Sequence, residues 1–477
     1  MKRIKHRLVV VGSGSGGFAA ARTARDMGAD VALVDHGPLG GLCILRGCMP
    51  SKTLIASSDA VQDMREAGEL GIHAGNITID FPHIMRRKRE LVKGFADYRI
   101  EGIEQFPLYM GQAHFLSPRE LQVGENLVVE ADKFIIATGS CVAPASAVHG
   151  LQDVGYIDSD GALELSELPK SLIVLGGGYI GCELGQFFAR MGVKTSIVLR
   201  SAHLLSTEDH DIGEALTEYY RDEGIDVHTK TQIMRVSMRD GKKVVHVARE
   251  GVEGDLEADE LLYCLGRVPN FSGLNLDAAQ VKCHAITGIE IDETMRTCNP
   301  DIYAIGDVAG KHMLVHVAIY EGEVAARNAL TNGNERVDYS LQKTHTVFSD
   351  PQVAVVGHTE RELQAQGVAY VKGTYDFAEH GKAQCLNKTK GFVKMMASAD
   401  TGEILGAAIL GAHGSDLIHE IIVAMRYKAT VQDFMLIPHL HPTMAEIWTY
   451  PAEECAAKIR MAGPGEVQPE VALGGTA

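Results

Sequence analysis

Two glycine-rich turns, each directly after a short apolar run, constrain the fold of this chain more than any other feature. The apolar runs are Leu8–Val11 and Leu172–Leu175, and each suits a buried parallel strand. Glycines then follow with the spacing GxGxxG, formed by Gly12, Gly14 and Gly17 in the first turn and by Gly176, Gly178 and Gly181 in the second. Such a turn lets the N-terminus of the next helix approach a pyrophosphate closely. The repeat therefore predicts an α/β chain with two Rossmann-like domains and two dinucleotides.

The residues after the first turn complete a dinucleotide-binding unit. A helix is expected from about Phe18 to Met27, and the next apolar run, Val31–Val34, indicates a second strand. Asp35 follows this strand, about twenty residues beyond the glycines, where a carboxylate can bind a ribose hydroxyl. A lone GxGxxG is a weak signal, but strand, helix and acid in register make it a specific one.

Two cysteines, Cys43 and Cys48, lie close together in the segment GGLCILRGCMPSK, residues 40–52. In an ideal helix their Cα atoms would be about 8 to 9 Å apart, whereas a disulfide needs about 5.5 Å. The two can bridge only if one of them lies in a distorted turn at a helix start, and the glycines of this segment give the backbone that freedom. A helix N-terminus also lowers the pKa of a thiol. From spacing alone, a redox pair and two unrelated buried thiols are equally consistent with the sequence.

The composition limits the classes of protein to which the chain can belong. A chain of 477 residues, 45% hydrophobic and 22% charged, can form about two to four domains with substantial cores. No apolar segment approaches the length of a membrane span, and the basic start lacks the long apolar run of a signal peptide. Nine scattered cysteines fit a reducing cytoplasm better than a secreted disulfide framework. The formal net charge of −17 argues against nucleic acid as a partner.

The cysteine segment closely resembles the active-site segment of the class I flavoprotein disulfide reductases. This pyridine nucleotide-disulfide oxidoreductase family includes dihydrolipoamide dehydrogenase, glutathione reductase and mercuric reductase. Further segments extend the resemblance over nearly the whole chain. They are the ATG motif at Ala137–Gly139, the GRxPN turn at Gly266–Asn270, the flavin-contacting segment Thr297–Asp307, the opening of a dimerisation domain at Phe348–Ala354, and HPTxxE at His441–Glu446.

The resemblance implies that the first nucleotide unit binds FAD and the second NAD or NADP. The cofactor-binding residues implied for FAD are Gly12, Gly14, Gly17, Asp35, Lys52, Thr138, Gly139 and Asp307. Those implied for the second nucleotide and the turn that ends its domain are Gly176, Gly178, Tyr179, Gly181, Arg200 and Arg267. Tyr179 would be a gate over the flavin that the nicotinamide displaces. No metal site is expected.

The resemblance also assigns the catalytic residues. It makes Cys43 and Cys48 a redox-active disulfide with Cys48 against the flavin, and it pairs Lys52 with Glu183. Exchange of this disulfide with a substrate needs a group with a pKa near 7 to take the thiol proton, and histidine meets that need. His441 is expected to be this base, oriented by the carboxylate of Glu446 and supplied to Cys43 across a homodimer.

The second nucleotide unit departs from the NAD-using relatives. The strand Lys194–Leu199 ends in leucine where those relatives carry glutamate, and Arg200 follows where the NADP-using relatives carry an arginine for the 2′-phosphate. An arginine can bind that phosphate bidentately. The second arginine of the NADP-using relatives is replaced here by Ser206. With one arginine kept and one lost, NADP is favoured over NAD.

The predicted fold is α/β, with two nested Rossmann-like domains and a C-terminal α+β dimerisation domain. The expected parts are a first FAD-binding section with the redox disulfide (1–150), an NAD(P)-binding domain (151–275), a central segment that returns to the flavin domain (276–343), the dimerisation domain (344–460) and a flexible tail (461–477). The dimerisation domain is expected to alternate strands with two helical stretches.

Within the family, dihydrolipoamide dehydrogenase is the member that this chain resembles most. The Pro50-Ser51-Lys52 sequence separates the chain from glutathione reductase, and His441 separates it from mercuric reductase. The expected substrate is a lipoyl-bearing protein or a small dithiol or disulfide, although Leu42 and Ile44–Arg46 differ from the usual residues and could mark an unusual substrate. An NADPH-dependent reductase of a small disulfide or a metal ion remains an alternative, as does a flavin-binding redox sensor without turnover.

Overall fold

The N-terminal sheet is built on β1 (Lys2–Val11), whose second half is the apolar run predicted as a strand. We describe residues 1–462 in a computed structural model. β1 pairs in parallel with β2 (Val31–Asp35) and β6 (Leu127–Ile136). The full order is β3-β2-β1-β6-β5-β4, with β18 (Ile302–Ala304) also on β6. The other strands are β3 (Leu108–Met110), β4 (Ala113–Ser117) and β5 (Glu120–Val123).

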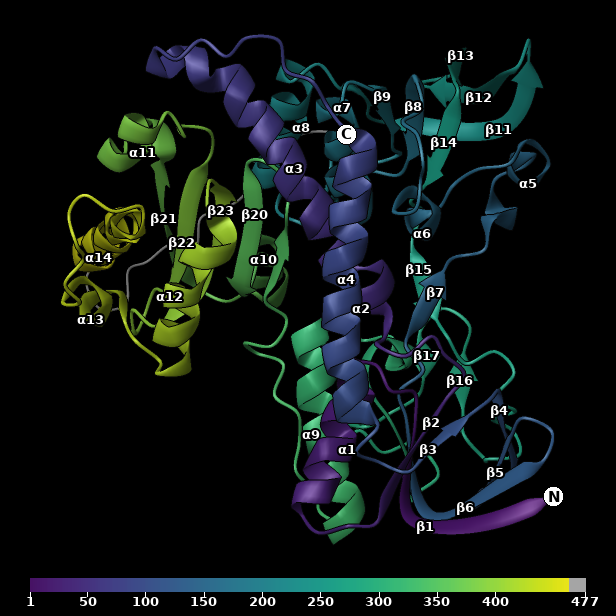
Figure 1. Ribbon diagram of the computed structural model, residues 1–477. Helices are drawn as coiled ribbons and strands as arrows, with labels where there is room; N and C mark the ends of the chain where they lie inside the picture. The colour runs from purple at the N-terminus through teal and green to yellow at the C-terminus, as the bar shows by residue number, and fades with distance from the viewer. Residues whose placement is uncertain (463–477) are drawn as a thin grey trace.

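Two helices pack against each other and against this sheet (Figure 1). They are α1 (Ser15–Asp26) and α9 (Val315–Thr331). A Cβ atom on Gly322 of α9 would lie 2.4 Å from the carbonyl oxygen of Gly16, so glycine permits the close approach. The predicted start of the first helix at Phe18 is wrong, because the helix begins at Ser15. Gly16 and Gly17 lie inside the helix rather than in the turn, since their missing side chains allow it to pack closely.

The cysteine segment forms the start of a helical layer between the lobes of the molecule (Figure 1). A short helix, α2 (Leu42–Arg46), is followed by α3 (Cys48–Glu66), a 3₁₀ turn (Ala67–Leu70) and the long helix α4 (Phe81–Ile103). α4 packs against both α2 and α3.

The second nucleotide-type domain repeats the design with a parallel sheet in the order β10-β9-β8-β14. Its strands are β8 (Ser171–Leu175), β9 (Lys194–Val198), β10 (Asp226–His228) and β14 (Glu260–Tyr263). Its helices are α7 (Tyr179–Arg190) and α8 (His210–Asp222), and an antiparallel sheet of β11 (Thr231–Arg239), β12 (Lys242–Arg249) and β13 (Val252–Ala258) stands at its outer side (Figure 1).

The chain leaves and re-enters the first domain through two adjacent strands. β7 (Ser140–Val142) pairs antiparallel with β15 (Arg267–Pro269), so the second domain is inserted between them. Short elements complete the connections. They are α5 (Leu151–Val154), α6 (Ser159–Ala162), β16 (Cys283–His284), β17 (Gly288–Ile289) and the 3₁₀ turns Ala145–Ala147 and Gly306–Ala309.

The C-terminal domain is an antiparallel sheet in the order β19-β20-β23-β22-β21. Its strands are β19 (His345–Val347), β20 (Gln352–Gly357), β21 (Tyr370–Asp376), β22 (Phe392–Ser398) and β23 (Ile404–Gly411). Its helices are α10 (Glu360–Gln366), α11 (Gly381–Leu386), α12 (Gly414–Arg426), α13 (Val431–Met435) and α14 (Thr449–Ala462), with 3₁₀ turns η4 (Phe377–Glu379) and η5 (Ala445–Trp448).

The prediction of two helical stretches in this domain is wrong, because the structure has five helices there. Three of them span only five to seven residues, which is too short to show a helical period in the sequence. The predicted tail, residues 461–477, lies outside the described residues except for the last two positions of α14.

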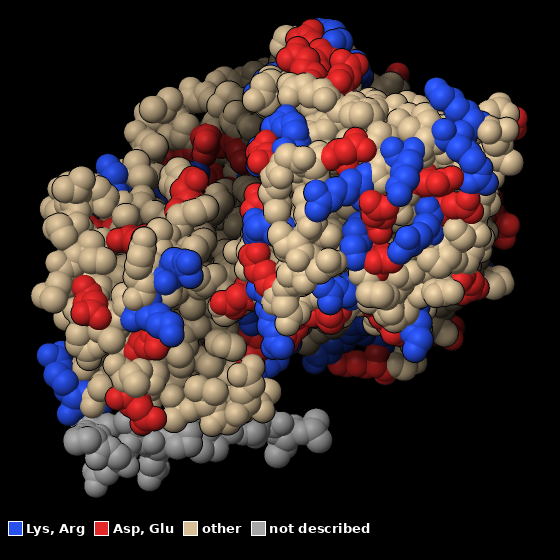
Figure 2. Space-filling model, turned by 90° about the horizontal axis from the view of Figure 1, so that it is seen from below, with Lys and Arg blue, Asp and Glu red and all other residues tan. Residues whose placement is uncertain are grey.

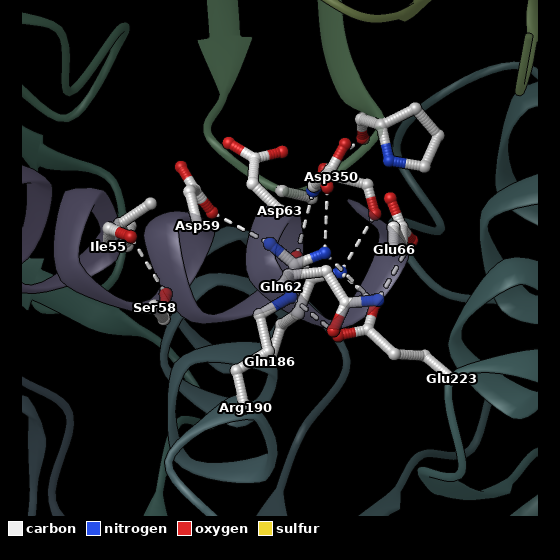
Figure 3. Close-up of polar contacts among 12 residues, drawn as sticks. Ile55, Ser58, Asp59, Gln62, Asp63, Glu66, Gln186, Arg190, Glu223 and Asp350 are labelled. Atoms are coloured by element: carbon white, nitrogen blue, oxygen red, sulfur yellow. Dashed lines mark hydrogen bonds and ion pairs between the residues drawn. The ribbon is translucent and has the colours of Figure 1, made fainter. Parts of the chain in front are cut away.

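A buried arginine joins the layer of helices to the second nucleotide-type domain and to the C-terminal domain (Figure 3). The guanidinium of Arg190, at the end of α7, is 1% exposed and contacts Asp59 on α3 at 2.7 Å, Glu223 after α8 at 2.5 Å and Asp350 at 2.7 Å. Gln186 adds hydrogen bonds to Glu223 and to the backbone of Asp350. This network fixes α3, which carries Cys48 and Lys52, against both neighbouring domains.

The surface carries both signs of charge. On the face shown in Figure 2, basic and acidic side chains are interspersed over most of the surface. Among the described residues, no helix combines the length and apolar character that a membrane crossing requires.

Candidate active site

A break between two helices brings the cysteines together. Cys43 lies in α2, Cys48 is the first residue of α3, and Gly47 between them interrupts the helix with φ −135° and ψ −112°. The two side chains are free thiols within hydrogen-bond contact of each other. A Cβ atom on Gly47 would lie 3.2 Å from the Cα of Cys43, so a larger residue would crowd this approach. The distorted helix start expected from the sequence is therefore present.

The two thiols have opposite electrostatic environments. The hydrogen bond from Cys43 lowers the pKa of Cys48 to about 7, against the effect of burial, and the charge of Lys52 lowers it further. The same hydrogen bond and burial raise the pKa of Cys43. In the reduced pair Cys48 therefore loses its proton before Cys43 does.

Lys52 and Glu183 form an ion pair between α3 and α7. The Lys52 Nζ lies 2.6 Å from Glu183 Oε2, and the Glu183 side chain is only 9% exposed. The other carboxylate oxygen accepts a hydrogen bond from the backbone N–H of Phe348, and Lys52 Nζ lies 4.5 Å from the centre of the Phe348 ring. Residues of three domains thus meet one helical turn beyond the cysteines.

A cavity of about 810 Å³ runs through the N-terminal domain to the cysteines. Most of the residues predicted to bind FAD line it, and Lys52 is not among the lining residues. The predicted residues that line it are Gly12, Gly14, Gly17, Asp35, Cys43, Cys48, Thr138, Gly139, Arg267 and Asp307.

The lining of this cavity fits a dinucleotide. Gly12 has φ +104°, and a Cβ atom there would lie 2.3 Å from the carbonyl oxygen of Ala137, so only glycine suits the turn. At Gly14 a Cβ would meet nothing closer than 3.9 Å, which leaves room for a phosphate beside the start of α1. The Asp35 carboxylate accepts hydrogen bonds from the N–H and hydroxyl of Ser13 at 2.8 and 2.6 Å and from the N–H of Gly37 at 2.8 Å, which hold it at the cavity wall.

The far wall of the cavity holds a second carboxylate. Asp307 accepts a hydrogen bond from the Ser140 hydroxyl at 2.6 Å, and burial raises the pKa of Asp307. Arg267 donates from Nε to the Ser140 hydroxyl and from Nη2 to the Ser140 carbonyl, each at 3.0 Å. The Thr138 hydroxyl donates to the carbonyl of Asn270 at 2.6 Å. This wall therefore depends on Ser140, which directly follows the ATG motif, and on Asn270, the last residue of the GRxPN turn. Neither residue was predicted to belong to the site.

The second glycine turn is formed in the same way, although it does not line this cavity. Gly176 has φ +114°, and a Cβ on Gly181 would lie 2.1 Å from the Gly176 carbonyl oxygen. Tyr179 begins α7, and its hydroxyl donates to Glu208 at 2.7 Å while its ring stacks on His345 with centroids 5.4 Å apart. Burial opposes protonation of His345, but Glu208 at 2.9 Å raises the pKa of this histidine. No sequence signal indicated the Glu208–His345 pair, because its members are 137 residues apart.

The end of β9 carries a free cation. Arg200 is exposed, and within the described part of the chain it has no ion pair or hydrogen bond, whereas Leu199 beside it is buried. A second guanidinium, that of Arg361 at the start of α10, donates to the carbonyl of Ser206 at 3.3 Å and to the carbonyl of Thr207. The guanidinium of Arg361 thus lies next to Ser206, which replaces the second arginine of the NADP-using relatives. The sequence motif did not indicate Arg361.

The histidine predicted as a base forms a dyad in the C-terminal domain. His441 Nδ1 lies 3.0 Å from Glu446 Oε2, and the His441 side chain is 81% exposed while that of Glu446 is 12% exposed. No contact among the described residues joins His441 to Cys43 or Cys48 of the same chain. The dyad is complete and faces outward.

Comparisons with known proteins agree with this fold. The family model for the pyridine nucleotide-disulphide oxidoreductases matches residues 6–322, and that for their dimerisation domain matches residues 344–452. The dihydrolipoyl dehydrogenase of Geobacillus stearothermophilus is 35% identical over 456 residues, which cover 94% of this chain and 96% of that protein. The mercuric reductase of Streptomyces lividans is 36% identical over 451 residues, covering 92% and 94%.

Solved structures show the same architecture. The HOCl-induced flavoprotein disulfide reductase RclA of Escherichia coli superimposes with a TM-score of 0.83 at 27% identity, covering 94% of this chain and 99% of that one. Its Cu(II) complex superimposes with a TM-score of 0.84 at 26% identity, covering the same shares.

Two nested nucleotide-binding domains, a cysteine pair at the end of the cavity and an antiparallel dimerisation domain define a flavin-dependent oxidoreductase. The chain belongs to the class I pyridine nucleotide-disulfide oxidoreductase family, whose members depend on FAD and a pyridine nucleotide.

Proposed function

We propose that this protein is a dithiol–disulfide oxidoreductase resembling dihydrolipoamide dehydrogenase, which moves two electrons between a dihydrolipoyl dithiol and NADP or NAD. The cysteine pair carries this proposal, because the pKa of Cys48 is lowered to about 7 while that of Cys43 is raised. Such an asymmetric pair suits Cys43 for exchange with the substrate and Cys48 for electron transfer to the cofactor.

FAD would be held by residues that line the N-terminal cavity. The glycines of the first turn would receive the pyrophosphate, Asp35 a ribose hydroxyl, and Asp307 a hydroxyl of the ribityl chain. Lys52, fixed by Glu183, would lie near the flavin ring. When bound, FAD supplies the relay of two electrons between the dithiol and the nicotinamide.

In the oxidation of a dithiol, His441 takes the proton from the first substrate thiol, and Glu446 stabilises the imidazolium that forms. The substrate thiolate then attacks the Cys43 sulfur, which breaks the Cys43–Cys48 disulfide and releases the Cys48 thiolate beside Lys52. The second substrate thiol displaces Cys43 from the mixed disulfide, and its proton passes to the departing Cys43 sulfur. The substrate leaves as a disulfide, Cys43 remains as a thiol, Cys48 remains as a thiolate, and His441 holds the first proton.

This chemistry requires a second copy of the chain, since His441 contacts neither cysteine of its own chain. Large apolar side chains are exposed on the stretch from the end of α12 to His441. They are Val423, Tyr427, Met435, Leu436, Ile437 and Leu440. Exposed apolar surface of this kind marks an interface, and its position beside His441 supports a homodimer in which each dyad serves the partner's cysteines.

For the pyridine nucleotide we favour NADP. Arg200 is a free cation at the end of β9, and the guanidinium of Arg361 lies against the Ser206 carbonyl, so two positive charges are available for a 2′-phosphate. Position 199 is a leucine, so the chain lacks an acidic side chain there to bind the ribose hydroxyl of NAD.

The second candidate is an NADPH-dependent reductase of a small disulfide or of a metal ion. The similarity to a mercuric reductase and to the Cu(II) complex of RclA favours it. The His441–Glu446 dyad favours the dithiol reaction, because a metal ion brings no thiol proton to remove. The nine cysteines are scattered along the chain, which fits a reducing compartment better than a secreted disulfide framework, so we place the protein in the cytoplasm.

The first experiment is the initial rate at which purified enzyme oxidises dihydrolipoamide with NAD or NADP offered separately. We expect turnover with both and a higher kcat/KM with NADP. The Arg361→Gln variant should lose at least part of that preference with NAD kinetics unchanged, and Arg239→Gln, an exposed arginine on β11, is the matched control. An enzyme that holds flavin and oxidises NADPH with a disulfide or metal acceptor, yet ignores dihydrolipoamide, would instead establish the second candidate.

A further inference from the structure

A second histidine, His380, lies behind the dyad and has no part in the mechanism described above. Its side chain is 0% exposed, and neither ring nitrogen has a hydrogen-bond partner among the described residues. The backbone holds it on both sides, since its N–H donates to the Phe377 carbonyl at 3.1 Å and its carbonyl accepts from Gln384 at 3.0 Å. These bonds fix the backbone of His380 between η4 and α11, and burial confines its imidazole.

The imidazole of His380 faces the carboxylate that orients the catalytic base. Its Nε2 lies 3.5 Å from Glu446 Oε1, while Glu446 Oε2 lies 3.0 Å from His441 Nδ1. The Glu446 carboxylate is thus placed between two imidazoles, one exposed and one buried. A further ionisable neighbour is Tyr450 of α14, whose ring meets His380 edge-on with centroids 6.2 Å apart and stacks on Tyr375 of β21 with centroids 3.9 Å apart.

A buried imidazole without a partner is costly, so its position calls for an explanation. Burial lowers the pKa of His380, the nearby His441 lowers it further, and Glu446 opposes both effects. The ring is therefore neutral at physiological pH and has a single N–H to donate. We assign that proton to Nε2, because this nitrogen faces the carboxylate and a slight closing of the 3.5 Å gap completes a hydrogen bond.

We propose that His380 is a positioning residue for the dithiol reaction, which holds the Glu446 carboxylate in line with His441 and thereby sets the proton affinity of that base. This inference rests on the proposed function. A donor on Oε1 withdraws charge from the carboxylate, so Glu446 stabilises the His441 imidazolium less than it would alone. His380 thus moderates the negative charge that Glu446 presents to the base, in addition to fixing the orientation of the carboxylate.

The test compares His380→Phe, which fills the space without a donor, with His380→Gln, which carries an amide N–H at the reach of Nε2. Both are made in the full-length holoenzyme, and kcat/KM for dihydrolipoamide is measured across pH. Flavin content, dimer content and anaerobic reduction of the bound flavin by NADPH are measured alongside, because none of these requires His441.

In His380→Phe we expect kcat/KM at pH 7 to fall about tenfold, the size of a lost hydrogen bond to a charged group, and the rising limb of the pH profile to move to higher pH by about half a unit or more. His380→Gln should restore most of both quantities. The inference would be overturned by a folded, dimeric His380→Phe enzyme whose pH profile has the same rising limb as that of the wild type. An equal loss of kcat/KM in His380→Phe and His380→Gln would also overturn it. The His441→Gln variant distinguishes a failure of the proposed function from a failure of the inference about His380. If His441→Gln keeps full activity, His441 is not the base, and the proposed function itself is wrong.

Discussion

The two active-site thiols differ in charge although they share one short segment. Cys48 begins α3 and receives both the Cys43 hydrogen bond and the field of Lys52, whereas Cys43 is the donor of that bond and is raised in pKa. Because the thiolate is the reactive form, transfer of electrons from the reduced pair should become faster as pH rises through about 7.

Lys52→Met should raise the pKa of Cys48, since it removes the ammonium that favours the thiolate. We expect the ultraviolet thiolate absorbance of the reduced enzyme to titrate about one pH unit higher than in the wild type. Lys93→Met, on the exposed face of α4, should leave the titration in place. If the two variants titrate together with the wild type, Lys52 does not set the charge of Cys48.

At this scale the sequence reveals the residues but not all of their neighbours. Cys43, Lys52 and the two glycine turns could be recognised because each lies in a short motif with strict local geometry. Asn270 lies within such a motif and Ser140 directly follows one, so the motifs themselves pointed to both residues. His380, Arg361 and the Glu208–His345 pair could not be found in this way, because each acquires its place only when distant segments pack together.

At the scale of secondary structure, α3 and α7 are held by a contact that no local pattern contains. Arg190 is 131 residues from Asp59, 33 from Glu223 and 160 from Asp350, yet it meets all three (Figure 3). The same reasoning explains the helices missed in the C-terminal domain, which are stabilised by packing and caps rather than by length. α10, for example, begins with a capping box between Thr359 and Glu362.

Arg190→Met should reduce the free energy of unfolding by about 3–5 kcal/mol near pH 7.5, because it leaves the buried carboxylate of Glu223 and the partly exposed carboxylates of Asp59 and Asp350 without this cation. The pKa of Asp59 is already raised to about 6, mainly by burial, and loss of Arg190 would raise it further. A carboxyl whose pKa is higher in the folded state destabilises the fold as pH rises through that value, so the loss should be smaller at pH 5.

Urea unfolding at the two pH values measures this difference, with the exposed Arg239→Met as control. An equal loss at both pH values would mean that lost packing, rather than uncompensated charge, accounts for the effect.

At the scale of the whole molecule, one chain contains both the nucleotide-binding domains and the proposed base, but it keeps the base apart from the cysteines. The cysteines end the N-terminal cavity, whereas His441 lies in the C-terminal lobe, exposed beside Leu440 and Leu436. In a two-fold symmetric dimer, both subunits contribute the same surface to the interface. Each subunit can therefore place its proposed base beside the cysteine pair of the other.

This arrangement predicts complementation between two inactive chains. Cys43→Ser and His441→Gln each disable every site in their own homodimers. A heterodimer purified through two different tags pairs the intact Cys43 of one chain with the intact His441 of the other at one of its two sites, so it should show about half of the wild-type dihydrolipoamide activity. If cysteines and histidine acted within one chain, the heterodimer would contain no intact site and would remain inactive. Anaerobic reduction of the bound flavin by NADPH is the control, because it should proceed in the heterodimer under either arrangement.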